Sequence, residues 1–133
     1  MEESIEQIVL AAQRLVLRTQ WRSLLDSDFY PRIIVDWEGR IAMANVLALE
    51  LFNYPESLFL GHLVEEFMPR RFRESHVGYR SNFFECPVRR VMGGNLELAI
   101  LTRNGIEVPV DLGLAPLRVE EGTFVSITIQ RKP

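Results

Sequence analysis

The spacing of apolar residues changes from a helical period to a strand period near residue 28. Before that point apolar side chains recur every three or four positions, as in an amphipathic helix. A loop cluster follows, with Asp26-Ser27-Asp28 and then Pro31. Beyond it lies the β-branched run Ile33-Ile34-Val35, and later segments alternate as half-buried strands do. We therefore expect an N-terminal amphipathic helix over residues 1–28 and one folded domain over residues 29–133.

The N-terminal helix carries more apolar surface than an isolated helix exposes in water. Ser4 and Gln7 form a capping-box pair at its start. The apolar stripe consists of Ile5, Ile8, Val9, Ala12, Leu15 and Val16. Such a stripe packs on its own domain, on a second copy of the helix, or on both. Because buried apolar area is worth roughly 25 cal/mol per Å², we expect this stripe to form a homodimer interface.

The strand-like segments form two hairpins and one final strand. In the first hairpin, residues 33–35 and 41–44 flank a polar turn. The second joins alternating segments across an Asn104-Gly105 turn, which favours a tight hairpin. A last strand covers residues 124–129. Together with the alternating segments on each side of that turn, these elements predict five strands.

Helical segments lie between the two hairpins. Asn45 can cap a helix that runs to Phe52. Short helices at residues 55–61 and 64–67 follow, and then a longer one at residues 72–84. This order predicts an α+β fold, a five-stranded antiparallel sheet with short helices on one face.

Composition excludes several classes of partner and location. The formal net charge of −3 argues against nucleic acid or an anionic membrane as the partner. The one cysteine, Cys86, has no internal disulfide partner and no companions for a zinc site. No run reaches the ~18 uncharged apolar residues of a membrane span, and Met1-Glu2-Glu3 is acidic where a signal peptide is basic. We therefore expect a cytoplasmic protein.

The sequence offers no catalytic motif. It contains no serine nucleophile elbow, no phosphate-binding glycine loop and no His-x-x-x-His pair. Met92-Gly93-Gly94-Asn95 indicates a bend before a strand. Glu65, Glu66 and Asp111 are interpreted as scattered surface charge, because none has a partner for acid–base work. We expect a protein that is not an enzyme.

Several runs of the sequence resemble the PAS domain of bacterial sensor proteins. They are Ile33-Ile34-Val35-Asp36, Gly39-Arg40-Ile41 with Asn45, Leu51-Phe52-Asn53-Tyr54-Pro55-Glu56, Leu60-Gly61, Met68-Pro69-Arg70, Arg73, His76, Arg80, Pro87, Arg90, Met92-Gly93 and Arg103-Asn104-Gly105-Ile106-Glu107-Val108-Pro109-Val110. The resemblance covers about residues 33–130. It implies the PAS fold.

The resemblance also implies a function. PAS domains are sensory or interaction modules, usually parts of histidine kinases of two-component systems, cyclic-nucleotide enzymes or transcription regulators. They commonly dimerise through an N-terminal flanking helix and act on an effector domain or a partner protein. Some hold a small ligand between the sheet and the helices. We expect the same dimerisation and the same action on an effector domain or partner protein here.

The main alternative function depends on His76. An Arg-x-x-His-x-x-Tyr run around it resembles that of oxygen-sensing haem PAS kinases, in which a histidine of this helix ligates the iron. That resemblance implies a haem-binding gas or redox sensor with His76 as the axial ligand. Those sensors hold the propionates with an arginine and a tyrosine, where this chain has Asn82 and Phe83, and face the gas with an arginine, where it has Leu96. The other interpretation is a hydrogen-bonded structural histidine, with no metal site.

A flavin is not expected. Light-sensing relatives need a cysteine in an Asn-Cys-Arg-Phe motif, and this sequence has none. Cys86, which precedes Pro87, is interpreted as an unreactive thiol.

The remaining cofactor question concerns a recess between the sheet and the helices. The side chains expected to face it are Phe72, His76, Met92, Leu96, Leu112, Leu114 and Ile127. A mostly apolar lining with one or two polar groups is typical of a small-molecule site. The alternative is that these side chains fill the space as an ordinary core. The sequence leaves both open, an apolar ligand such as a fatty acid or metabolite, or no ligand.

Overall fold

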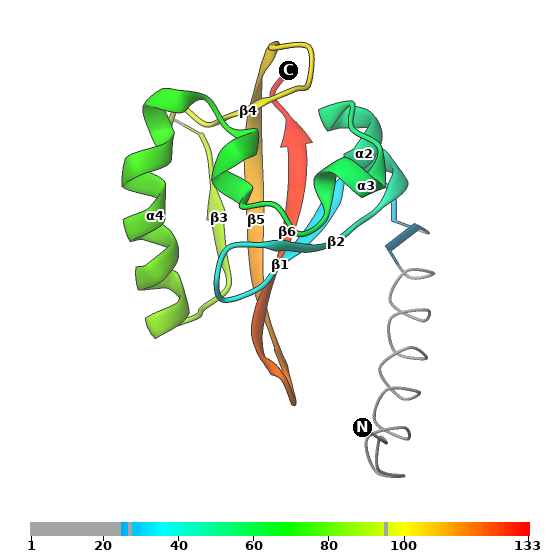
Figure 1. Cartoon of the computed structure of the whole chain (residues 1–133). Helices are drawn as coiled ribbons and strands as arrows, with labels where there is room; N and C mark the ends of the chain where they lie inside the picture. The colour runs from blue at the N-terminus through cyan, green and yellow to red at the C-terminus, as the bar shows by residue number, and fades with distance from the viewer. Residues whose placement is uncertain (1–24, 27, 95) are drawn as a thin grey trace, which may run out of the picture.

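The computed structural model describes residues 25–26, 28–94 and 96–133 (Figure 1). The predicted dimer stripe lies outside these residues, so it stays a prediction; it consists of Ile5, Ile8, Val9, Ala12, Leu15 and Val16. The domain boundary expected at residue 28 also stays a prediction.

An antiparallel sheet forms the centre of the molecule. Its strands are β1 (Arg32–Val35), β2 (Ile41–Ala44), β3 (Arg90–Met92), β4 (Ala99–Leu101), β5 (Glu107–Val119) and β6 (Gly122–Arg131). Neighbouring strands follow the order β2-β1-β6-β5-β3, and β4 also pairs with β5. The described residues thus contain six strands where five were predicted; the additional one is β3. The α+β class and the antiparallel pairing are confirmed.

Two turns set the register of the three strands β4, β5 and β6. In the turn between β4 and β5, Gly105 takes a φ of 80°, and the Thr102 Oγ1 accepts a hydrogen bond from the backbone N–H of Ile106. Because β4 and β5 pair across this turn, the predicted Asn104-Gly105 hairpin is confirmed. Glycine suits position 105, since a positive φ favours glycine. The next hairpin places Val119 opposite Gly122, so β5 and β6 pair along nearly their whole length.

The helices follow one another between β2 and β3 in the chain. Their bounds are α2 (Val46–Phe52), α3 (Glu56–Phe59), the 3₁₀ helix η1 (Val64–Phe67) and α4 (Arg70–Glu85). In Figure 1, α2 and α3 lie at one end of the sheet, and α4 runs beside β3 at the other edge. The helices predicted at residues 64–67 and 72–84 are confirmed as η1 and α4, and α4 starts two residues earlier.

Asn45 joins three segments at the start of α2. Its side chain is 1 % exposed. Its Oδ1 accepts hydrogen bonds from the backbone N–H groups of Ala48 and Arg32, at 2.9 Å each. Its Nδ2 donates to the carbonyl oxygens of Leu25 and Tyr30, at 3.1 and 2.8 Å. The predicted cap is confirmed, and it also fastens α2 to the chain that leads into β1.

An aromatic cluster forms the core beneath α2, α3 and η1. The ring of Phe59 is fully buried, and its centroid lies 4.5 Å from that of Phe67 and 5.0 Å from that of Phe52. Tyr54 packs edge-on against Phe67 at 5.1 Å. Short helices bury little area each, so these shared rings hold the helical layer together.

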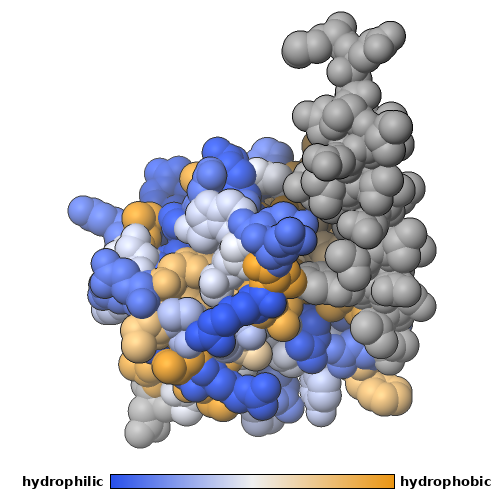
Figure 2. Space-filling model, turned by 90° about the horizontal axis from the view of Figure 1, so that it is seen from below, coloured by the Kyte–Doolittle hydropathy of each residue, from blue (hydrophilic) through white to orange (hydrophobic). Residues whose placement is uncertain are grey.

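The β5–β6 hairpin extends past both strands that flank it. β1 reaches only Val125 of β6, and β3 reaches only Leu114 of β5. The remaining two-stranded arm projects from the sheet in Figure 1. The ring of Trp37 supports the arm by packing edge-to-face on Phe124 at 5.5 Å. Seen from below, the molecule shows hydrophobic residues interspersed with hydrophilic ones (Figure 2).

Candidate functional site

The inner side of α4 is the first part of the candidate site. Pro69 directly precedes the helix, and Cys86 and Pro87 end it. Of its sixteen residues, all of which are described, Phe83 is the one that is buried. Phe72, His76 and Arg80 lie half-buried on the helix. Most of α4 is therefore positioned by something other than apolar burial.

A buried ionic cluster connects α4 to η1. Glu65 of η1 is 6 % exposed. Its Oε2 lies 2.6 Å from the Nδ1 of His76 and 3.2 Å from the Nε of Arg80. Its Oε1 accepts a hydrogen bond from the Nη2 of Arg80 at 2.9 Å. Both carboxylate oxygens are therefore satisfied by side chains one helical turn apart on α4.

The β1–β2 turn completes this cluster. Gly39 has a φ of 87°, and a Cβ added to it would lie 2.5 Å from the guanidinium carbon of Arg80. The absence of a side chain at Gly39 thus lets Arg80 lie flat against the turn. The backbone N–H of Val64 donates to the carbonyl of Gly39 at 2.8 Å, which holds the turn beside η1.

The prediction that Glu65 is a surface charge was wrong. Glu65 lies between Val64 and Phe67 in a short helix, and half of η1 faces the core. His76 and Arg80 lie four residues apart, so their side chains share one face of α4. That spacing was the available signal, but it does not say which acid they meet. The geometry gives His76 the hydrogen-bonded role that the sequence left open beside haem ligation.

Acid should destabilise the fold by protonating the carboxylate of Glu65. Burial alone raises the pKa of this carboxyl, but hydrogen bonds from His76 and Arg80 outweigh burial and lower the pKa below its ordinary 4.5. The stabilisation is therefore complete above pH 4.5 and is lost as the pH falls through the lower pKa of the folded state. We expect Glu65→Gln to lower the free energy of unfolding by about 2 kcal/mol at pH 7.

Urea unfolding between pH 7 and pH 3 would measure this effect. The difference in the free energy of unfolding between the wild-type protein and Glu65→Gln should shrink as the pH falls. Glu74→Gln is the matched control, because Glu74 is exposed on the same helix. A difference that is unchanged at pH 3 would contradict the role given to the carboxylate.

A second set of ion pairs fastens the first turn of α4. The guanidinium of Arg71 lies 2.9 Å from Glu97 and 2.8 Å from Glu107, at the entrance to β5. The hydrogen bond with Glu107 raises the pKa of Arg71 and lowers that of Glu107. These pairs are exposed, so each contributes little alone. They nevertheless tie α4 to the strand hairpin beyond it.

The strand residues expected to face the recess share one face of the sheet. Met92 lies opposite Leu112, and Leu114 lies opposite Ile127. Directly paired residues project to the same face, as do residues two apart on a strand. Leu112, Leu114 and Ile127 are half-buried against the core. The structure therefore brings the four strand residues together.

One position of the expected lining does not point inward. Leu96 is 57 % exposed. It precedes β4, which begins at Ala99 rather than at residue 96, so the inward orientation predicted for it was wrong. Tyr79, the tyrosine of the Arg-x-x-His-x-x-Tyr run, is also exposed.

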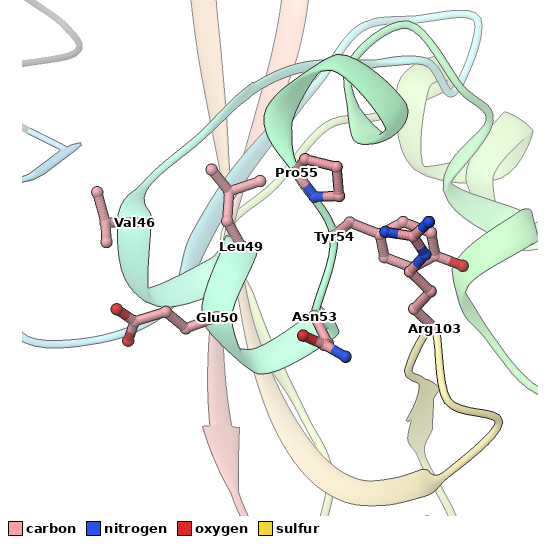
Figure 3. A pocket seen from close by; sticks show the side chains of 7 residues that line it. All are labelled: Val46, Leu49, Glu50, Asn53, Tyr54, Pro55 and Arg103. Carbon is pink, nitrogen blue, oxygen red and sulfur yellow. The ribbon is translucent and has the colours of Figure 1, made fainter.

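A separate groove lies beside α2, and no pattern in the sequence predicted it. It has a volume of about 320 Å³ and is lined by Val46, Leu49, Glu50, Asn53, Tyr54, Pro55 and Arg103 (Figure 3). The guanidinium of Arg103 lies 5.8 Å from the ring centroid of Tyr54. The backbone N–H of Arg103 donates to the carbonyl of Phe52 at 3.0 Å. These contacts fix the wall that the β4–β5 turn contributes.

Within the described residues, no three histidine, cysteine or acidic side chains lie together as the ligands of a metal ion would. None of the helices in the described ranges is both long and apolar enough to cross a lipid bilayer.

The fold matches solved PAS domains. The PAS domain of an HTR-like protein from Haloarcula marismortui has a TM-score of 0.71 at 20 % identity, over 92 % of this chain and 98 % of that one. The PAS domain of nitrogen regulation protein NR(II) from Vibrio parahaemolyticus has a TM-score of 0.65 at 10 % identity, over 84 % and 96 %. The PAS domain of the quorum-sensing receptor RpfR from Cronobacter turicensis, solved in complex with BDSF, has a TM-score of 0.64 at 20 % identity, over 80 % and 97 %. The predicted PAS fold is confirmed.

The family follows from a match to the sequence itself. Residues 24–130 match the model of the diguanylate cyclase-like sensor domain. The chain belongs to this family and is a PAS sensory domain of the kind found in signalling proteins.

Proposed function

We propose that this domain is a non-catalytic cytoplasmic sensor domain that binds a small apolar molecule between α4 and the sheet. The observation that supports this most is the shared apolar face of Met92, Leu112, Leu114 and Ile127. α4 is held near that face mainly by charged contacts rather than by close apolar packing. An apolar lining with a few polar groups at its margin suits a ligand such as a fatty acid or metabolite.

Native mass spectrometry of the freshly purified protein tests this proposal. We expect a bound small molecule in the wild-type protein and its loss in Leu114→Trp, which fills the recess. Ile106→Trp is the control, because Ile106 is exposed on the β4–β5 turn. A wild-type mass equal to that of the bare polypeptide, or equal binding by Leu114→Trp, would overturn the proposal.

We also propose that the domain acts as a homodimer through the N-terminal stripe and passes its signal to an effector domain or partner protein. The support is the apolar period of residues 5–16 in the sequence. Light scattering over a dilution series should show that Ile8→Lys shifts the protein toward monomer. Gln13→Lys, which changes a polar position between the apolar ones, should leave the dimer intact. A wild-type monomer at high micromolar concentration would remove this part of the proposal.

One observation supports the second candidate, a haem sensor with His76 as the axial ligand. The Glu65 carboxylate lies 2.6 Å from the Nδ1 of His76, and the hydrogen bonds of the described residues leave the other ring nitrogen, Nε2, unpaired. A carboxylate on one ring nitrogen orients the ring and raises the basicity of the other, as around many metal-bound histidines. Haem would supply gas or redox chemistry at that nitrogen.

Hemin titration followed by visible absorption separates the two candidates. If the domain is a haem sensor, hemin bound to the wild-type protein should show a shifted Soret band. His76→Gln should abolish this shift, and His62→Gln, at the exposed second histidine, should preserve it. An unchanged hemin spectrum, or one that His76→Gln does not alter, would exclude it.

A further inference from the structure

The first three turns of α4 are attached to the molecule almost entirely through charged groups. Arg71 pairs with Glu97 and Glu107, and His76 and Arg80 meet Glu65. Arg73 donates to the carbonyl oxygen of Met68 at 3.1 Å. By contrast, the last turn is held by apolar contacts, with Phe83 buried in the core and Phe84 packed against it. The two ends of the helix are therefore secured by different forces.

These two kinds of attachment differ in how they break. An apolar contact weakens gradually with exposed area, whereas a hydrogen-bonded ion pair is lost when one partner moves away by a few ångströms. Once Glu65 is displaced, a buried carboxylate loses three donor contacts together. Water can then solvate the separated charges, which offsets part of the cost of breaking these contacts.

We propose that α4 is a hinged lid, with Glu65 as its latch and the Phe83–Phe84 end as its hinge. When the latch opens, residues 70–80 move away from η1 and uncover the apolar strand face beside β3. This inference rests on the proposed function, because it makes the lid the entrance for the ligand. The latch itself is a property of the protein without ligand. It can therefore be tested separately.

Hydrogen–deuterium exchange followed by mass spectrometry tests the latch in the purified protein at neutral pH. In Glu65→Gln we expect amides of residues 74–80 to exchange about tenfold faster, because the weaker side-chain contact lets this part of α4 separate from η1 and open locally more often. Peptides from β5 and β6, which exchange through global unfolding, should stay protected over the short labelling times at which residues 74–80 exchange. Glu74→Gln, on the exposed side of the same helix, should match the wild-type protein throughout.

A second variant covers the case in which Glu65→Gln does not fold. Arg80→Met keeps the aliphatic stem and leaves Glu65 with His76, so it should produce a smaller acceleration in the same amides. Exchange of residues 74–80 only together with the β5–β6 hairpin would show that α4 opens by global unfolding and would overturn the latch. Unchanged exchange in residues 74–80 of both variants would also overturn it. Because the experiment compares the amide exchange of variants purified in the same way, failure of the ligand proposal leaves its result unaffected.

Discussion

Asn45→Ala is expected to lower the free energy of unfolding by about 3–4 kcal/mol, one of the two largest effects of a single substitution in this domain. The alanine side chain removes two acceptor contacts and two donor contacts at a position that is almost fully buried. Four backbone groups then lose their partner where water has little access. Three segments are released together: the start of α2, the chain at residues 25–30, and the first residue of β1.

Urea unfolding followed by circular dichroism would measure this loss. Asn45→Asp is the informative companion, because it keeps the acceptor for Ala48 and Arg32 but removes the donor for Leu25 and Tyr30. We expect Asn45→Asp to fall between the wild-type protein and Asn45→Ala. If Asn45→Ala costs less than about 1 kcal/mol, the ordinary value of a helix cap, the linking role beyond the cap would be refuted.

Phe59→Ala should cost about 3–5 kcal/mol. Its ring is in contact with three other aromatic rings, and it is fully buried. Removing it leaves a cavity beneath three helices that are too short to hold together alone. We also expect near-ultraviolet circular dichroism to lose intensity, since Phe52, Tyr54 and Phe67 lose their common neighbour.

Leu58→Ala provides the comparison for Phe59→Ala. The two residues are adjacent on α3, but Leu58 is exposed. Its truncation should change the free energy of unfolding by less than about 0.5 kcal/mol. Similar costs for the two substitutions would mean that α3 does not bury Phe59 as described.

The sequence predicts best where a local interaction determines the conformation. Asn45 caps its helix through the backbone three residues away, and Gly105 permits its turn through its own φ. The alternation of residues 108–114 also follows from a property of one strand. These features depend on neighbours in the chain, which the sequence displays directly.

The features that the sequence does not predict depend on distant neighbours. β3 has three residues and no clear alternation, and it becomes a strand because β5 offers it an edge. Glu65 is buried because His76 and Arg80 approach it from another helix. Leu96 fits an alternating pattern, but the Gly93 carbonyl accepts a hydrogen bond from its backbone N–H and keeps it in a turn. Each outcome is decided by tertiary contacts.

The place of β1 between β2 and β6 has a kinetic consequence. Ile33 and Val35 pair with residues about ninety positions later in the chain, Ile127 and Val125. Contacts of such long range slow folding, because most of the chain must be ordered before they form. During synthesis, β1 emerges from the ribosome long before β6 does, so one edge of the apolar strand β1 stays unpaired until β6 is made. That interval is when this domain is most prone to aggregate.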